Sequence, residues 1–246
     1  MRIITINRPK SKNALDIPMR AQLTALTSAS HGDPEIRAVV ITGAGGTFCS
    51  GADVTAMEQQ TDPVKARARV ETAQQIARSI GGGSTPVIAA VEGVAFGAGL
   101  AIALACDYIV ATPEVRLSAA FVNVGLSGDA GILFSLPQRV GPARARTMLM
   151  MGQTIEGTEA LRIGLVDELT APGDALDKAT AVATSLAARP PLAIAAIKGA
   201  FAALPISLEA ALETEVRLQA PLLGSNDFQE AISAFKEKRK PTFTGA

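Results

Sequence analysis

The residues with the clearest potential for chemistry are two closely spaced glycines, Gly97 and Gly99, at the start of an apolar run. Glycine permits unusual backbone dihedrals and lets other atoms approach closely. A helix beginning between residues 98 and 100 would direct its free N–H groups and the positive end of its dipole at whatever lies in front of it. Such an arrangement can stabilise a developing negative charge without a metal ion or a special side chain.

These glycines lie within residues 87–107, which combine three kinds of segment. The stretch begins with apolar and β-branched residues at 87–91, breaks at Glu92 and Gly93, and continues as a run rich in Ala, Leu and Ile. We therefore predict a strand, a tight turn and a buried helix. By itself, the same pattern also fits an ordinary core strand and helix that perform no chemistry.

Two further interpretations fit this stretch less well. Glu92 and Asp107 enclose a run shorter than the roughly 20 apolar residues of a membrane-spanning helix, and three glycines interrupt that run. A dinucleotide-binding Gly-x-Gly-x-x-Gly motif would require Gly or Ala where Ile102 stands. We therefore expect neither a membrane association nor a dinucleotide cofactor here.

Several ordered motifs together resemble one protein family. Residues 91–99, VEGVAFGAG, followed by ACD at 105–107, are similar to the central signature of the crotonase family, the enoyl-CoA hydratase/isomerase superfamily. Residues 48–54, FCSGADV, are similar to a second part of that signature. The resemblance extends from residues 7–9 to residues 236–241 and covers almost the whole chain. It implies an enzyme acting on acyl-CoA thioesters, with coenzyme A as part of the substrate and no separate cofactor.

The resemblance assigns roles to the segment at residues 51–54. It makes the backbone N–H of Ala52 one donor of an oxyanion hole, with Gly51 beside it, and places Asp53 and Val54 at the border of the adenine pocket. The N–H of Ala98 becomes the second donor of the hole. Alternatively, the same segment begins a helix with Asp53 as its N-cap, and both interpretations can hold together.

A polar loop at residues 7–13 carries three cations, Arg8, Lys10 and Lys12. Composition alone is consistent with a solvated turn. The resemblance instead makes the loop one wall of the coenzyme A site, with these cations near phosphates. We favour that interpretation, because a protein without net charge needs local positive charge to bind a polyanion.

The two catalytic glutamates of the family's hydratases are both missing. By the resemblance, one would lie two residues after Gly99, where the chain has Ala101, and the other falls on Phe121. A hydratase of the two-glutamate type needs one carboxylate to activate water and a proton donor for the α-carbon. The sequence therefore argues against that mechanism.

Asp129 is the only carboxylate in the segment 119–131. Its surroundings, GLSGDAG, resemble a segment of family members that shuttle protons with an aspartate, including double-bond and ring isomerases of acyl-CoA substrates. We expect a pocket lined by Phe121, Val122 and Leu126 to raise the pKa of Asp129, so that it can act as both base and acid. The alternative is that Asp129 only caps the following helix.

These observations predict an isomerase that stabilises a thioester enolate and moves a proton with Asp129. Two alternatives remain open. The protein could be an enoyl-CoA hydratase that directs water with Asp129 alone, or an acyl-CoA binding protein that has lost turnover.

Bulk composition restricts the classes of function. The chain has 246 residues with 23 Lys and Arg against 23 Asp and Glu, so its net charge is zero, which argues against a nucleic-acid partner. Cys49 and Cys106 have apolar neighbours and are expected to be buried and reduced. With two cysteines and one histidine, His31, which we predict lies in a solvated loop, we expect no metal site.

The fold class that positions these residues is α/β, and the resemblance implies a crotonase-like spiral of ββα units. We divide the chain into a core at 1–190, with the coenzyme A and active sites, and a helical region at 191–246. By the resemblance, that region forms a homotrimer or a dimer of trimers and places Phe235 or Lys238 near the adenine of a neighbour's coenzyme. Because no signal peptide precedes the first strand, we expect a cytoplasmic protein.

Overall fold

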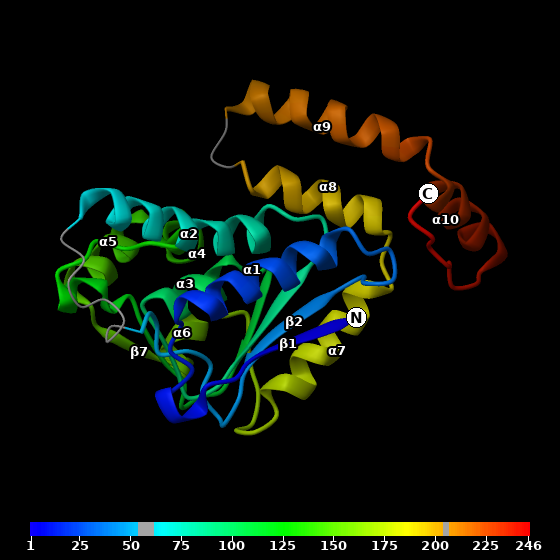
Figure 1. Ribbon diagram of the computed structural model, residues 1–246. Helices are drawn as coiled ribbons and strands as arrows, with labels where there is room; N and C mark the ends of the chain where they lie inside the picture. The colour runs from blue at the N-terminus through cyan, green and yellow to red at the C-terminus, as the bar shows by residue number, and fades with distance from the viewer. Residues whose placement is uncertain (54–61, 204–206) are drawn as a thin grey trace.

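The computed structural model describes residues 1–53, 62–203 and 207–246. A central sheet is covered on both faces by helices, and the last helices extend away from it (Figure 1). This is the expected α/β fold with a C-terminal helical region.

The main sheet is parallel throughout, with strand order β1-β2-β3-β5-β8. Parallel strands need crossover connections, which the helices between them supply. The strands are β1 (Arg2–Ile6), β2 (Val39–Gly43), β3 (Val87–Val91), β5 (Tyr108–Ala111) and β8 (Glu168–Leu169).

The central strand β3 is apolar at every position because both faces of the sheet are covered. In β3, Val87, Ala89 and Val91 point into a core shared with α1, α2 and α3. Ile88 and Ala90 point into a second core on the other face, against α7. The apolar run at 87–91 is therefore a strand at the centre of the sheet, as predicted.

A second, smaller sheet follows the turn at Glu92 and Gly93. It contains β4 (Val94–Phe96), β6 (Arg116–Ser118) and β7 (Thr154–Glu156), with β4 and β6 parallel and β6 and β7 antiparallel. The prediction of a turn running directly into a helix therefore missed β4. Three residues are too few to show the alternation by which a strand is recognised in a sequence.

The helices of the spiral lie on the two faces of the main sheet. Helix α7 covers one face and the earlier helices cover the other (Figure 1). They are α1 (Ile17–His31), α2 (Pro63–Gly81), α3 (Ala98–Ala105), α4 (Ile132–Val140), α5 (Pro142–Met151), α6 (Gly157–Arg162) and α7 (Ala175–Ala187), with short 3-10 turns η1 (Pro9–Ser11) and η3 (Ala120–Val124).

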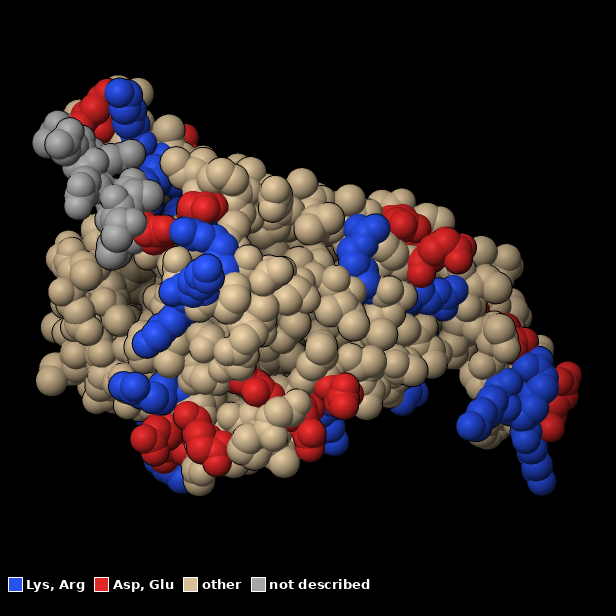
Figure 2. Space-filling model, turned by 60° about the horizontal axis from the view of Figure 1, so that its bottom comes forward, with Lys and Arg blue, Asp and Glu red and all other residues tan. Residues whose placement is uncertain are grey.

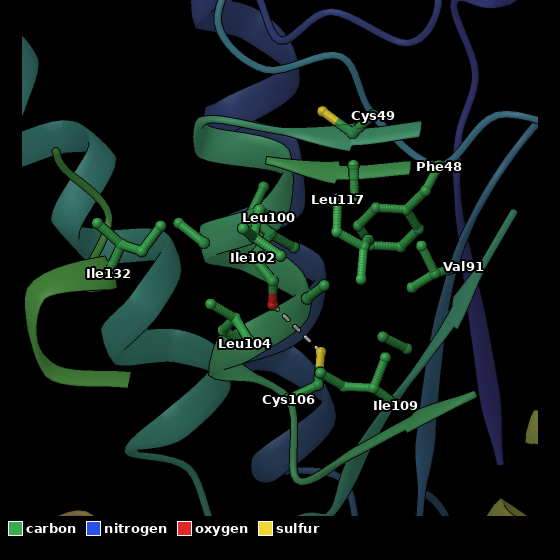
Figure 3. Packing of buried hydrophobic residues seen from close by; sticks show 14 of the residues in the cluster. Phe48, Cys49, Val91, Leu100, Ile102, Leu104, Cys106, Ile109, Leu117 and Ile132 are labelled. Atoms are coloured by element: carbon green, nitrogen blue, oxygen red, sulfur yellow. Dashed lines mark hydrogen bonds between the residues drawn. The ribbon is translucent and has the colours of Figure 1, made fainter. Parts of the chain in front are cut away.

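Both cysteines are buried and unpaired, as predicted. Cys49 lies near Leu117, and Cys106 lies at the end of α3, where its thiol donates to the carbonyl of Ile102 (Figure 3). Burial raises the pKa of Cys49 to about 11 and that of Cys106 to about 12. Both thiols are therefore protonated at neutral pH and serve as core packing.

The single histidine has a structural role, and the prediction of a solvated loop residue is wrong. His31 is the last residue of α1 and is half-buried. Its Nε2 donates to the carbonyl of Ser79, and its Nδ1 accepts from the N–H of Thr85 at 3.1 Å. His31 thus joins the end of α1 to α2 and to the loop before β3.

The C-terminal helices are α8 (Pro191–Phe201), α9 (Leu208–Leu223) and α10 (Asn226–Glu237). Helix α9 stands clear of the sheet and α10 lies at the far end of the molecule (Figure 1). The two helices expose several large apolar residues, among them Leu208, Val216 and Phe235. The boundary at residue 190 remains a prediction. Lys198 of α8 forms an ion pair with Asp107, just before β5, so α8 is joined to the preceding core.

Within the described residues, no single helix is both long enough and apolar enough to cross a membrane; α7 and α8 pass that test only as a pair bent by 110°.

Candidate active site

Two backbone segments far apart in the sequence meet at the start of α3. Cys49 forms a parallel bridge with Ala95: its N–H donates to Val94 at 3.0 Å and its carbonyl accepts from Phe96 at 3.0 Å. A Cβ added to Gly51 would lie 3.7 Å from the nitrogen of Ala98. The structure therefore brings residues 49–51 against the N-terminus of α3, as the predicted oxyanion hole requires.

The N–H of Ala52 is directed by its bridge with Leu15. The N–H of Leu15 donates to Gly51 at 2.8 Å, and the N–H of Asp53 donates to Leu15 at 3.0 Å. Because Leu15 bonds to both neighbours of Ala52, the N–H of Ala52 itself points away from Leu15. Among the described residues it has no acceptor, so it can donate to a ligand on the other side of the segment.

The N–H of Ala98 has no hydrogen-bond acceptor among the described residues for a different reason. Ala98 is the first residue of α3, so no carbonyl lies one helical turn before it to accept its N–H. The preceding Gly97 has φ +52° and ψ −118°, a conformation that only glycine adopts readily. The N–H of Gly97 donates to Ser118 at 2.9 Å, which fixes this turn.

The loop at residues 8–13 is anchored by a fully buried asparagine. Asn13 Nδ2 donates to the carbonyls of Ala44 and Thr47, and Asn13 Oδ1 accepts from the N–H of Arg8. Further along, the N–H of Ser50 donates to the carbonyl of Lys12 at 2.9 Å. The basic loop therefore lies alongside the segment 49–51 that leads to Ala52.

The three cations of this loop have different environments. Arg8 donates to Asp53 at 3.0 Å and also lies 3.4 Å from Asp16, so its charge is matched by neighbouring carboxylates. Lys10 and Lys12 are exposed, and neither forms an ion pair within the described residues. The geometry thus favours the two lysines over Arg8 as phosphate contacts. Val54, the remaining residue predicted for the adenine pocket, lies outside the described residues.

Asp129 lies in an unusual piece of backbone. The flanking residues Gly128, Ala130 and Gly131 have φ values of +126°, +50° and +81°. Ala130 is buried and adopts the left-handed region at an energetic cost, because its Cβ is crowded there. Strain of this kind persists only where the surroundings hold the backbone firmly, and it is typical of functional sites.

Asp129 does not cap the following helix. The N-cap of α4 is Gly131, and no side chain bonds to the free N–H groups of that cap. The alternative in which Asp129 serves only as a helix cap is therefore wrong. The sequence suggested it because Asp before an apolar run is a common cap, but the left-handed turn at Ala130 and Gly131 moves the helix start past it.

The carboxyl group of Asp129 is largely buried, and its Oδ1 has no hydrogen-bond partner in the described parts of the chain. Burial raises its pKa above the ordinary aspartate value, and nearby Arg20 and Arg69 partly offset that rise. A carboxyl group with these properties can accept a proton and return it, as general acid–base catalysis requires.

Buried apolar residues occupy the two positions where the resemblance places the catalytic glutamates of the family's hydratases. Ala101 is fully buried in α3. Phe121 is buried in η3, and its ring lies 3.9 Å from where a Cβ on Gly97 would be. Phe121 therefore lies beside the start of α3. Val122 and Leu126, which were predicted to line a pocket around Asp129 together with Phe121, are instead exposed.

Phe235 and Lys238 lie at the end of α10, far from α1 and η1 in the same chain (Figure 1). Phe235 is 83% exposed. Neither residue can serve the site of its own chain in this arrangement. Their predicted contact with a neighbour's coenzyme stays a prediction.

Sequence reasoning missed Arg20, a buried arginine of α1 whose charge acts on Asp129. A signal for it was present. Arg20, Leu23 and Thr27 recur at helical spacing, and all three lie on the buried face of α1. An arginine on such a face is rarely buried without a reason.

A cavity of about 710 Å³ lies at the other end of α3, between α2, α4 and α8. Leu104, Phe134 and Ile197 contribute to its lining, together with Ala130 and Gly131 next to Asp129. Neither Ala52 nor Ala98 lines it, so the cavity does not include the predicted oxyanion hole.

The described residues contain no group of three or more His, Cys, Asp or Glu side chains suited to a metal ion. On the face shown in Figure 2, acidic and basic side chains are intermingled and separated by uncharged surface. The chemistry that this arrangement supports is thus stabilisation of an oxyanion by two backbone N–H groups, with proton transfer at one buried carboxyl group.

Comparison with known proteins identifies the family to which the chain belongs. The family model described as enoyl-CoA hydratase/isomerase matches residues 1–246. A protein of Rhodobacter capsulatus described as a probable enoyl-CoA hydratase is 41% identical over 244 residues, which cover 99% of this chain and 94% of that protein. The (E)-benzylidenesuccinyl-CoA hydratase of Thauera aromatica is 35% identical, covering 99% of this chain and 95% of that protein.

Solved structures agree in fold. The crystal structure of an enoyl-CoA hydratase from Polaromonas sp. JS666 superposes with a TM-score of 0.92 at 36% identity, covering 98% of this chain and 95% of that one. The chain belongs to the enoyl-CoA hydratase/isomerase family, within the crotonase superfamily, and its fold is the crotonase fold.

Proposed function

We propose that the protein isomerises an acyl-CoA thioester by moving a proton with Asp129. The thioester oxygen would lie between the N–H groups of Ala52 and Ala98, where two backbone donors stabilise the charge of an enolate. The observation that carries the proposal is the buried carboxyl group of Asp129, whose Oδ1 has no partner within the described residues.

The proposed reaction on a 3-enoyl-CoA has two proton transfers. The carboxylate of Asp129 removes a proton from C2, and the electrons of that C–H bond move into a dienolate whose charge rests on the thioester oxygen. Protonated Asp129 then returns the proton to C4. The double bond moves from C3–C4 to C2–C3, and Asp129 regains its starting state. Each backbone donor of such a hole is worth on the order of 10² to 10³ in rate.

Isomerisation needs only one carboxyl group, because one group can take and return the same proton. Ala101 and Phe121 supply no second acid or base at the positions where the family's hydratases have glutamates, and both are buried and apolar. A carboxyl group with a raised pKa is a better proton donor in the second step than an ordinary aspartate.

Hydration of a 2-enoyl-CoA is the second candidate. The names of the relatives favour it, since the R. capsulatus and T. aromatica proteins are both described as hydratases. In that reaction Asp129 alone would direct water to C3 and protonate C2. A third candidate is a binding protein without turnover, which the two missing glutamates would explain.

The test uses the purified protein in D₂O with 2-enoyl-CoA and 3-enoyl-CoA substrates, read by mass spectrometry. Deuterium entering the acyl chain without addition of water supports the isomerase. Addition of water makes the protein a hydratase with a single carboxyl group. Binding without either change, across acyl chains that include rings, leaves the binding protein. An Asp129→Asn variant that keeps turnover within a few-fold of wild type would rule out the proton shuttle.

We further propose a homotrimer or a dimer of trimers in the cytoplasm. The apolar residues exposed on α9 and α10, including Leu208, Val216 and Phe235, would be covered by neighbouring subunits. Sedimentation of the purified protein at several concentrations measures the mass of the assembly. A monomer at micromolar concentration would contradict this proposal.

A further inference from the structure

Asn13 is a fully buried asparagine whose amide group forms hydrogen bonds in three directions. Its Nδ2 donates to the carbonyls of Ala44 and Thr47, and its Oδ1 accepts from the N–H of Arg8 at 2.8 Å. Its backbone has φ +57°, in the left-handed region that asparagine adopts more readily than most residues. The position therefore requires both an amide group and a left-handed backbone.

The two carbonyls that Asn13 binds lie at the start of the segment 44–53, which contains Ala52. Beyond the end of β2, this segment pairs with other strands only through two isolated bridges, at Cys49 and Ala52. Gly45 and Gly46 follow β2 with φ +69° and +67°, and glycine gives the chain additional conformational freedom there. The path of the segment therefore depends on bonds from its neighbours rather than on a helix or strand of its own.

The residues on either side of Asn13 hold the other end of the same segment. The carbonyl of Lys12 accepts from the N–H of Ser50 at 2.9 Å, and Leu15 bonds to both neighbours of Ala52. Both ends of the segment are thus held by one short stretch of the basic loop, with Asn13 in its middle. Removing the amide group releases the first end while the second stays attached, which leaves the orientation of Ala52 less well determined.

We propose that Asn13 is a positioning residue for the oxyanion hole. By joining the carbonyls of Ala44 and Thr47 to the basic loop, it orients the N–H of Ala52 toward the thioester oxygen. Asn13 acts through the backbone and does not touch the substrate. The inference rests on the proposed function, because it takes Ala52 and Ala98 as the two donors, but it does not depend on which reaction follows.

The test measures the bound thioester carbonyl directly, so that it needs no turnover. A saturated acyl-CoA with ¹³C at the thioester carbonyl is bound to the protein, and isotope-edited infrared spectra give the shift of the carbonyl stretch between free and bound ligand. Hydrogen bonds from the hole should lower this frequency in wild type. Asn13→Gly keeps the left-handed backbone but removes all three amide bonds, and should lose roughly half of the shift because one of two donors is displaced.

Kinetics give a second readout for Asn13→Gly on substrates that wild type converts. We expect kcat to fall about 10- to 100-fold while KM changes less than about three-fold, because a donor to the oxyanion acts mainly in the transition state. A rise in KM with unchanged kcat would contradict the proposal, since it would place the effect of Asn13 on ligand binding alone.

Two further variants separate positioning from a purely structural role. Thr27→Ala is the matched control: it removes another fully buried side-chain hydrogen bond, to the carbonyl of Leu23 within α1, and should lower stability but leave the carbonyl shift unchanged. Asn13→Ser keeps one hydroxyl donor and should give a shift between those of wild type and Asn13→Gly. If Asn13→Gly does not fold, Asn13→Ser decides the question. The full wild-type shift in either folded Asn13 variant overturns the proposal.

Deuterium exchange separates this inference from the proposed function. Exchange into the acyl chain by wild type, together with an unchanged carbonyl shift in Asn13→Gly, would defeat the role of Asn13 and leave the isomerase intact. A shift that wild type shows and Asn13→Gly loses, without exchange into any enoyl-CoA, would support the role of Asn13 and defeat the isomerase. A bound carbonyl without any shift in wild type would defeat both, because no oxyanion hole would then be present.

Discussion

Gly99 packs directly against the carbonyl oxygen of Cys49, and a Cβ added to Gly99 would lie 2.2 Å from that oxygen. The contact joins the start of α3 to the segment 49–51 that leads to Ala52. Both atoms belong to backbone segments that other bonds hold in place, since Cys49 also bonds to Val94 and Phe96. The separation of the two proposed oxyanion donors, Ala52 and Ala98, therefore depends on the absence of a side chain at residue 99.

Replacing Gly99 with alanine should force these two segments apart. We expect kcat/KM to fall by roughly 10²-fold or more, because a displaced donor no longer reaches the oxyanion, and stability to fall by about 1–3 kcal/mol from overpacking. Gly32 provides the control: it is exposed, has φ −90°, and has no atom within 4 Å of an added Cβ. Gly32→Ala should change neither quantity appreciably. A fully active Gly99→Ala protein would show that the hole does not depend on this contact.

Asp129→Asn tests the cost of the buried charge independently of activity. Burial raises the pKa of Asp129 in the folded protein, so the native state favours the protonated carboxyl group. That contribution to stability is complete below the pKa of the unfolded chain and is lost as pH rises through the raised pKa. An asparagine stays neutral throughout and avoids the loss.

The expected result is a difference that depends on pH. The thermal midpoint of Asp129→Asn minus that of wild type should become more positive as pH rises through the raised pKa and then level off. Comparing the two proteins at each pH cancels the titration of all other groups. A difference that is constant with pH, or that falls as pH rises, would show that Asp129 is not a buried carboxyl group of raised pKa.

The exposed lysines of the first loop should contribute to coenzyme A affinity. Arg8 is matched by Asp53 and Asp16, whereas Lys10 and Lys12 are exposed. We expect the Lys10→Met, Lys12→Met double variant to raise KM about 2- to 10-fold with little change in kcat, since phosphate contacts bind ground state and transition state alike. The increase should shrink at high salt, because exposed charges are screened. Lys65→Met on the exposed side of α2 serves as control. An unchanged KM would place the phosphates elsewhere.

Much of the fold could be predicted because its signals are local. The strand at 87–91, the glycine turn and the helix that follows are each marked by composition, and both cysteines were placed in the core by their apolar neighbours. Strand β4 was not predicted. It exists because Val94–Phe96 pairs with β6, and a three-residue pairing is decided by a partner far along the chain.

The candidate site was predicted in part. Ala52 and Ala98 could be named through the resemblance of their segments to the crotonase signature, and the structure brings those two segments together. Arg20 could not be assigned a role, because its electrostatic interaction with Asp129 joins two residues that are more than a hundred positions apart in the sequence. The same holds for the pairing of Arg8 with Asp53, which alters the part that Arg8 can play.

A largely buried ion pair joins α8 to the spiral, and breaking it should be costly. Lys198 donates to Asp107 at 2.5 Å and to the carbonyl of Thr85 at 3.0 Å, and Asp107 also accepts from the N–H of Val87. Lys198→Met leaves Asp107 without its cation at the start of β5. Because breaking a buried pair costs 3–5 kcal/mol and Asp107 keeps some contact with water, we expect a loss of about 2 kcal/mol. Urea denaturation measures this loss.

The control is Lys178→Met, which removes an exposed pair with Glu168 and should cost less than about 1 kcal/mol. Equal effects of the two variants would mean that the Lys198 pair is no stronger than a surface contact and that other packing holds α8 in place.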